Sequence, residues 1–428
     1  MTKVVIIFTE NLRQMSSVLS KTSVDESANR FGFELFKVFH SRHKNEYKNI
    51  SFSPLTVFNS LAMILIAAEN QSQTQLASVL HLSDIKKDKT VLERLKELSR
   101  DLIESNQDII LAIRFLYINK GIELKEDYKT ILKEYFEVKA KKMDFSDVEE
   151  SVKTINEDSK RSTDGIIDEV IEKKDISGEN KNVKLILTNS LFFRGFWSAK
   201  FEGEFKEKFT FGKNNQQTAD IHMIRHLGLL RHIHFQPLKA HIVSIPYSSN
   251  ELRMIVILPD DPKSDGHYLI EYLNKHLFET IMNELYGRDG SPIDLMIPEF
   301  GLDAQKMSVQ RTIKQMGAIN IFEESVADLK GMSESPVFLT KLVHKAFILV
   351  DERGSAEGDP RIRKTKDVKP FVFKANHPFV FLIADKKTKV VLFMSYIGDP
   401  REMLEVVKEK DLTQEQIFEL LANSESYD

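Results

Sequence analysis

Apolar residues recur at helical spacing in several segments of the chain. In residues 27–42, Phe31, Leu35, Val38 and Phe39 fall on one helix face, which predicts an amphipathic helix. The same periodicity predicts four later helices, at residues 90–103, 126–136, 267–286 and 308–317.

Strand-like segments dominate the second half of the chain. Runs rich in Val, Ile, Leu and Phe cover residues 183–193, 241–247, 251–259, 294–300, 337–352, 378–385 and 390–398. Several runs are apolar at nearly every position, which is typical of strands covered on both faces. Because the strands concentrate late, the order favours an α+β fold over a regular alternation of strand and helix.

Composition is that of a large globular protein. Of the 428 residues, 42% are hydrophobic and 29% charged, and neither an internal repeat nor a Pro/Gly/Ser-rich linker divides the chain. The net charge of -4 gives no whole-protein electrostatic reason to expect binding to nucleic acid or an anionic membrane. No segment approaches the ~20 apolar residues of a membrane span. We therefore expect a monomer with protein partners and no cofactor.

Two features bear on the compartment. The apolar run near the start covers only residues 4–8, whereas a secretory signal needs about 7 to 15 apolar residues. An intracellular location is therefore slightly favoured. Secretion is the alternative, because Asn70-Gln-Ser is a usable glycosylation sequon. The absence of cysteine excludes disulfides and thiol nucleophiles but leaves the compartment undecided.

Common catalytic signatures are absent from the sequence. It contains no GxGxxG, GxxxxGK[ST], HExxH or GxSxG motif, so no enzymatic activity is expected. Five histidines gather between residues 222 and 241: His222, His226, His232, His234 and His241. His232 and His234 would share one strand face and could chelate zinc. Because no carboxylate or cysteine completes the set at a readable spacing, surface histidines without a metal are the favoured interpretation.

A series of motifs between residues 25 and 400 resembles the serpins. "NISFSPLT" at residues 49–56 fits that family's pattern, as do "LTNSLFFRGFW" at 187–197, "LVHKAFILVDERGS" at 342–355 and the segment 373–400. The resemblance implies one domain over residues 25–400, with three β-sheets and eight or nine helices. It also implies an exposed reactive-centre loop over about residues 352–372.

Segments outside this domain flank it on both sides. Residues 1–24 form an N-terminal segment, and residues 401–428 extend beyond the usual end of a serpin. A capping box of Thr413 and Gln416 predicts a short helix in that extension.

The resemblance also assigns roles within the domain. Ser53, Thr56, Asn189 and His344 match a hydrogen-bonded group beneath the central sheet, where strands part during loop insertion. Trp197 matches the aromatic residue at the top of the same sheet.

Loop chemistry decides whether the family's inhibitory mechanism is available. In inhibitory serpins the cleaved loop inserts as a new central strand, so every second loop residue must enter the core. Glu352, Arg353, Gly354 and Ser355 match the hinge of that loop. Counting by twos from Ser355 places four ionisable residues in the core: Glu357, Asp359, Arg361 and Arg363. An isolated buried charge costs several kcal/mol, and Pro360 lacks the N–H that a central strand donates.

Loop length supports the same conclusion. Eighteen residues separate Gly354 from Phe373, about four fewer than inhibitory members carry, which removes about 13 Å of reach. A non-inhibitory serpin is therefore the leading prediction, with a trypsin-like protease cutting it as a substrate. The alternative is an inhibitor of such proteases that uses Arg361, Arg363 or Lys364 as the scissile residue. Counting from Gly354 points to Val368 instead, and counting back from Phe373 points to Lys364.

Two further departures from the family pattern concern the sheet. The motif "IPEF" places Glu299 opposite Glu352, where the family usually has a basic residue. Like charges are therefore expected to repel there, unless Arg353 lies between them and neutralises Glu352. In the helix over the sheet, Asp158 and Ser159 occupy positions that are usually apolar.

Overall fold

A computed structural model describes ten stretches of the chain. They are residues 24–42, 48–82, 89–104, 110–163, 165–177, 182–213, 216–249, 251–303, 309–354 and 368–403. The N-terminal segment up to residue 23 and the predicted C-terminal helix lie outside these stretches. In the described part, none of the helices has both the length and the apolar content needed to cross a bilayer.

Each of the five helices predicted from apolar periodicity has a counterpart in the described residues, and four further helices, two between residues 54 and 80 and two between 148 and 176, were not predicted in this way. Residues 24–42 are helical, followed by α2 (Pro54–Ala67), α3 (Asn70–Leu80), α4 (Lys89–Glu104), α5 (Glu126–Ile131), α6 (Val148–Ser162), α7 (Lys173–Ile176), α8 (His267–Tyr272), α9 (Lys275–Tyr286) and α10 (Val309–Met316). The helix predicted over residues 267–286 is in fact two helices. Leu273 is extended there, and the Asn274 side chain accepts a hydrogen bond from Leu277 N at 3.1 Å, which starts α9 anew.

Three sheets form, the number that the resemblance implied. One has five strands in the order β10 (Phe300–Asp303), β11 (Leu339–Val350), β4 (Leu185–Arg194), β2 (Ile110–Asn119), β3 (Lys139–Met143). A second runs β1 (Ile50–Phe52), β14 (Val391–Ile397), β13 (Phe379–Asp385), β8 (Leu252–Pro259), β7 (Ala240–Pro246), β6 (Gln217–Phe235). The first part of the long strand β6 also belongs to a third sheet, with β5 (Gly203–Phe211), β9 (Ser291–Pro298) and β12 (Phe371–Lys374).

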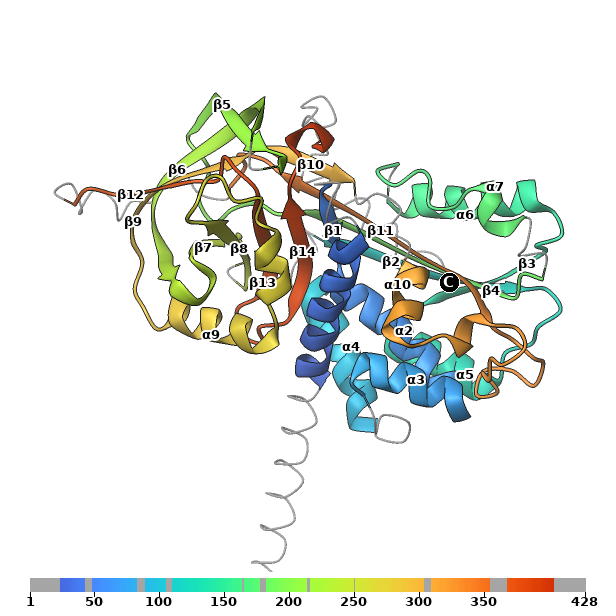
Figure 1. Ribbon diagram of the computed structural model, residues 1–428. Helices are drawn as coiled ribbons and strands as arrows, with labels where there is room; N and C mark the ends of the chain where they lie inside the picture. The colour runs from blue at the N-terminus through green and yellow to red at the C-terminus, as the bar shows by residue number, and fades with distance from the viewer. Residues whose placement is uncertain are drawn as a thin grey trace, which may run out of the picture.

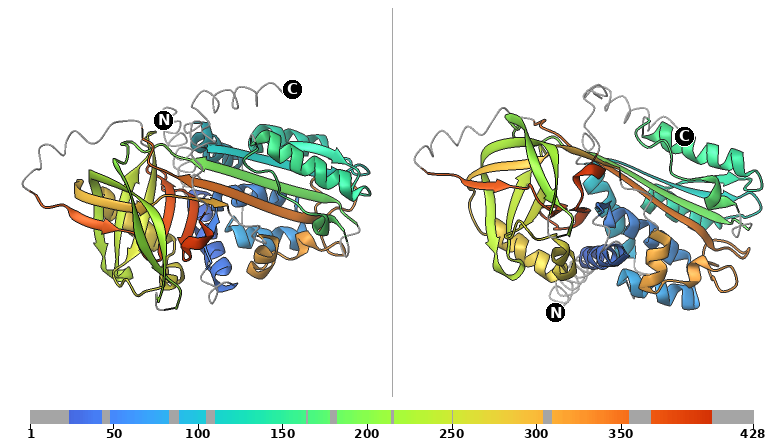
Figure 2. Two further views of the ribbon diagram at one scale, coloured as in Figure 1. Left: turned by 90° about the horizontal axis from the view of Figure 1, so that it is seen from above. Right: turned by 45° about the horizontal axis from the view of Figure 1, so that its top comes forward.

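Helices cover both faces of the five-stranded sheet. Figures 1 and 2 show α6 and α7 on one face, with α2, α3, α4 and α10 on the other. Helix α2 is buried along nearly its whole length, as expected for a helix that is apolar on all sides. It forms the centre of the main core, and a smaller core lies between α6 and the opposite face of the sheet.

The inner face of α6 carries the two polar residues that the sequence placed there. Asp158 is buried and accepts hydrogen bonds from Tyr117 Oη at 3.2 Å and Lys141 Nζ at 2.9 Å. Ser159 Oγ donates to the Ile167 carbonyl at 3.1 Å. Both side chains therefore satisfy their polar atoms within the layer beneath the helix.

Polar residues join α2 to the five-stranded sheet. Ser53 caps the helix by accepting from Thr56 N at 3.3 Å, and its own N–H donates to His344 Nε2 at 3.0 Å. One turn further along, Asn189 Nδ2 donates to Ser60 Oγ at 3.1 Å. These bonds tie the first two turns of the helix to β4 and β11, the two neighbouring strands in the middle of the sheet.

Burial keeps the imidazole of His344 neutral. Its side chain is 1% exposed, and this burial lowers the pKa of His344 to about 3. In the unfolded chain the pKa returns to an ordinary value near 6.5. Between these two values the unfolded state binds the extra proton, so this residue stabilises the fold above about pH 6.5 and progressively less as the pH falls towards 3.

Replacing His344 with Gln should reduce the acid sensitivity of the protein. From pH 7 to pH 5, the wild type should lose about 2 kcal/mol more of its unfolding free energy than His344→Gln, because only the wild type must keep this site unprotonated. Denaturant titrations at the two pH values measure the difference. The control variant His276→Gln changes an exposed histidine on α9 and should behave as the wild type. Equal pH slopes for all three proteins would contradict the prediction.

Candidate functional site at the end of strand β11

Strands β4 and β11 meet along a parallel ladder that we call the β4–β11 seam. The register runs from Leu339 opposite Leu185 to Leu349 opposite Arg194. The resemblance described above makes this seam the place where an inserted strand would have to enter. Its core-facing side chains come from alternate positions: Leu187, Asn189, Leu191 and Phe193 on β4, and Leu342, His344, Ala346 and Ile348 on β11. All are at most 3% exposed, and six of the eight are apolar.

Beyond the end of β11, residues 351–354 form a hinge segment that lies against the chain after β4. Trp197 N donates to the Arg353 carbonyl at 2.9 Å, and Phe201 N donates to the Glu352 carbonyl at 3.0 Å. The indole Nε1 of Trp197 donates to the Asp351 carbonyl at 2.6 Å. Gly354 and Trp197 also form a parallel β-bridge. Two backbone bonds, one bond from the indole and one β-bridge therefore attach the hinge segment to residues 197–201.

Trp197, which makes two of these hydrogen bonds, is fully buried. Trp197 is 1% exposed, and its ring stacks on Tyr247 with centroids 4.6 Å apart and planes 10° from parallel. Burial, with a smaller contribution from the Asp351 carboxylate, raises the pKa of Tyr247. Trp197, which the resemblance placed at the top of the sheet, thus lies directly beneath the hinge segment.

Asp351 is the electrostatic centre of the hinge segment. Its carboxylate is 3% exposed and pairs with the guanidinium of Arg353, whose Nε lies 3.0 Å from Oδ2. Arg194 Nε, at the end of β4, lies 3.4 Å from the same oxygen. The Arg353 guanidinium also covers the ring of Phe196 at 5.9 Å. A buried carboxylate with two cations holds the ends of both seam strands together.

Sequence reasoning missed Asp351, although a signal was present. In an extended segment, residues two apart point to the same side, so Asp351 and Arg353 had to lie side by side. The sequence instead raised Arg353 as a possible neutraliser of Glu352.

Three carboxylates gather beside the hinge segment. One oxygen each from Glu204, Glu299 and Glu352 lie within 4.8 Å of one another. The pair Glu299 and Glu352 was predicted from the "IPEF" motif, whereas Glu204 on β5 was not. Like charges at this separation repel by about 1 kcal/mol per pair even in a water-like dielectric.

The remaining loop positions predicted from the sequence lie outside the described residues. These are Ser355, Glu357, Asp359, Pro360, Arg361, Arg363 and Lys364, and the described chain resumes at residue 368. It then enters β12, which pairs in parallel with β9 at the edge of the third sheet (Figure 1). The described structure therefore fixes the two anchors of the loop, the hinge segment and β12.

Comparison with known proteins places the chain in a family. The family model described as Serpin (serine protease inhibitor) matches residues 26–400. A leukocyte elastase inhibitor of Xenopus tropicalis is 29% identical over 385 residues, covering 88% of this chain and 100% of that protein. Serpin B3 of Homo sapiens is 28% identical over 400 residues, again covering 88% of this chain and 100% of the relative.

Solved structures show the same fold. Maspin superimposes with a TM-score of 0.80 at 22% identity, covering 89% of this chain and 100% of maspin. Uncleaved ovalbumin gives a TM-score of 0.78 at 23% identity, covering 88% of this chain and 100% of ovalbumin. The predicted fold class is thereby confirmed. With a family model that spans nearly all of the folded part and relatives aligned over their whole length, the chain belongs to the serpin family.

Proposed function

We propose that this serpin is non-inhibitory: its exposed loop is cut by proteases as a substrate and does not enter the five-stranded sheet. The protein then acts as a monomer through a protein partner, without catalysis of its own. The observation that carries the proposal is a mismatch between the residues of the loop and the side chains that flank the β4–β11 seam.

Charge is the first part of this mismatch. A strand inserted at the seam would direct alternate side chains toward Leu191, Phe193, Ala346 and Ile348, each of which is fully buried and apolar. The loop would offer Glu357, Asp359, Arg361 and Arg363 at those positions. Each unpaired charge costs several kcal/mol in such surroundings, and pairing recovers that cost only with good geometry.

Backbone hydrogen bonding is the second part. A strand between β4 and β11 would have neighbours on both sides, so each of its N–H groups that points along the sheet needs an acceptor. Pro360 has no N–H to donate, and Gly358 weakens a strand through its backbone entropy. Inserting this sequence would therefore break the β4–β11 ladder and form two new ladders that are weakened at Gly358 and Pro360.

Close packing of the hinge segment supports the proposal as well. A Cβ atom added to Gly354 would lie 2.3 Å from Lys200 N and 2.6 Å from Ala199 C, both of which are backbone atoms. Bonds from Trp197 and Phe201 hold the two preceding carbonyls. The chain thus leaves the sheet through a tightly fitted contact, which insertion would have to break.

An inhibitor of trypsin-like proteases is the second candidate. Several basic side chains, Arg361, Arg363, Lys364 and Lys366, offer cleavage positions to enzymes whose specificity pocket pairs a carboxylate with a basic residue. The name of the Xenopus tropicalis relative also records inhibition of an elastase. Under this reading the charges would be accommodated in the sheet after cleavage.

Trypsin separates the two functions. We expect rapid cleavage within residues 355–367, no complex that survives denaturing electrophoresis, and a melting temperature within a few degrees of the uncut protein. Gel electrophoresis and thermal melts of cut and uncut protein measure these outcomes. A covalent complex, or a rise of tens of degrees after cleavage, would establish the inhibitor instead. A variant with Arg361, Arg363, Lys364 and Lys366 changed to Ala serves as the uncut control.

Restoring the family's loop chemistry should restore insertion. The variant carries Glu357→Ala, Asp359→Ala and Pro360→Ala, with four small uncharged residues added after position 360. Because small side chains would now face the seam, cleavage should raise its melting temperature by several degrees or more, with some inhibition of trypsin. The matched control has the four added residues but keeps the native Glu357, Asp359 and Pro360. If cleavage leaves both melting temperatures unchanged, charge and proline do not explain the block.

Gly354→Ala should loosen the hinge segment. The added methyl group meets the backbone at residues 199 and 200, so we expect a loss of about 1–3 kcal/mol in unfolding free energy. Gly121→Ala is the matched control, because a Cβ there has its nearest contact at 3.6 Å, an ordinary distance. Denaturant titration of both variants measures the loss. Equal stability of the two would refute the tight contact at Gly354.

A further inference from the structure

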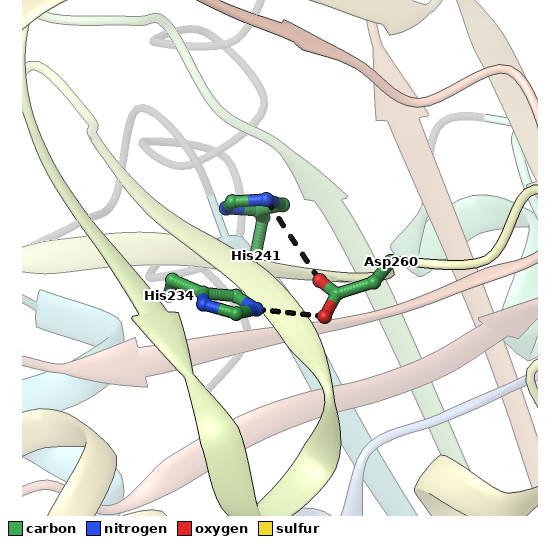
Figure 3. Close-up of side chains that lie close together, drawn as sticks. All are labelled: His234, His241 and Asp260. Atoms are coloured by element: carbon green, nitrogen blue, oxygen red, sulfur yellow. Dashed lines mark hydrogen bonds and ion pairs between the residues drawn. The ribbon is translucent and has the colours of Figure 1, made fainter.

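Four titratable side chains lie together at the hairpin between β6 and β7: three histidines of the hairpin and an aspartate that follows β8. His234 on β6 lies directly across the ladder from His241 on β7, and His232 lies two residues back along β6. Ring centroids are 4.6 Å apart for His234 and His241, and 5.1 Å for His232 and His241. Asp260 follows the end of β8 and directs its carboxylate between the rings of His234 and His241 (Figure 3).

Distances within this group suit a single metal ion. His234 Nε2 lies 2.7 Å from Asp260 Oδ2, and His241 Nε2 lies 3.8 Å from Asp260 Oδ1. All three ligand atoms fall within 4.8 Å of one another. A tetrahedral zinc ion with bonds of about 2.0–2.1 Å holds its ligand atoms about 3.3 Å apart. Side-chain rotations that change these separations by up to about 1.5 Å would bring the three donors to that spacing.

The second nitrogen of each imidazole also has a suitable partner. A metal-bound histidine usually donates its other ring N–H to an acceptor, which fixes the ring. His241 Nδ1 lies 3.0 Å from His232 Nε2, which accepts this hydrogen bond when the His232 ring carries its proton on Nδ1. His234 Nδ1 lies 3.0 Å from the amide of Gln236, whose oxygen accepts when the amide is turned over.

Solvent reaches the group from one side. The side chains of His234, His241 and Asp260 are 37%, 30% and 34% exposed, which leaves a path for an ion and room for a water at a fourth position. Two imidazoles and a carboxylate favour zinc over calcium or magnesium, which prefer oxygen ligands.

We propose that His234, His241 and Asp260 bind a divalent transition metal ion, with zinc as the best match. In this site, His232 fixes the orientation of the His241 ring through the hydrogen bond at His241 Nδ1. The sequence had raised zinc at His232 and His234 and set it aside for lack of a third ligand. In the structure Asp260, 19 residues after His241 in the sequence, lies beside His234 and His241 and offers the third ligand. This inference does not rest on whether the loop inserts.

The proposed site touches one anchor of the loop. Phe371, the first residue of β12, stacks on His232 with ring centroids 4.3 Å apart and packs against His241 at 4.8 Å, with the two rings tilted by 43°. A metal bound to His241 would hold the ring on which Phe371 rests. The ion would therefore steady the strand that receives the C-terminal end of the loop.

Zinc titration of the full chain tests the proposal. The protein is prepared without a polyhistidine tag, treated with a chelator and dialysed, and Zn²⁺ is then added in a calorimeter. We expect one ion per chain. His241→Ala and Asp260→Asn should each weaken binding at least tenfold by removing a ligand, and His232→Ala should weaken it about tenfold through loss of the supporting hydrogen bond.

Controls keep the result specific to this hairpin. His222→Ala changes an exposed histidine near the other end of β6 and should leave the affinity unchanged. Co²⁺ gives a second readout, since strong visible absorption would report a four-coordinate site. Melts in chelator show that each variant is folded. Absence of saturable binding to the wild type would overturn the proposal, as would wild-type affinity in a doubly substituted His241→Ala, Asp260→Asn protein.

Discussion

Direct pairing of β4 with β11 is the constraint on which the rest of this molecule depends. The two paired strands cover one side of the main core. Any segment inserted between them would therefore have to replace the apolar contacts that their side chains make with this core. The same two strands hold α2 through His344 and Asn189, each fully buried. Each of these polar groups bonds to α2 or its cap from its own strand, so opening the seam would expose apolar surface beside both contacts.

At the end of the seam near Arg194 and Asp351, attractive and repulsive charge interactions oppose each other. The buried carboxylate of Asp351 binds Arg353 and Arg194, which ties the end of β11 to the end of β4. Beside it, Glu299 and Glu352 repel each other. A buried carboxylate with two close cations is strongly destabilised if either cation leaves, whereas partly exposed like charges cost about 1 kcal/mol each. The balance therefore favours a closed seam and an attached hinge segment.

Local patterns in the sequence were sufficient for many of the elements, and the resemblance carried by ordered motifs was sufficient for the fold, but neither predicted all contacts between distant segments. Apolar periodicity and ordered motifs predicted helices, strands and three sheets. The continuous helix expected over residues 267–286 failed because Asn274 offers a cap in mid-pattern. Glu204 and Asp260 were missed because each meets its cluster from a separate strand, and no spacing along the chain records that meeting. The pairing of Asp351 with Arg353 could have been predicted, because side chains two residues apart in an extended segment lie on the same side.

The two anchors of the loop differ in kind, and this difference bears on how the protein can be controlled. At the N-terminal anchor, buried backbone bonds and Asp351 fix the hinge segment from several sides. At the C-terminal anchor, β12 is an edge strand whose Phe371 and Val372 are 38% and 51% exposed, and Phe371 rests on imidazole rings. A ligand bound at those rings would shift or steady β12, because fewer contacts hold this strand in place than hold the hinge segment. The position of the loop's C-terminal anchor can therefore be changed at β12 while the β4–β11 seam stays closed.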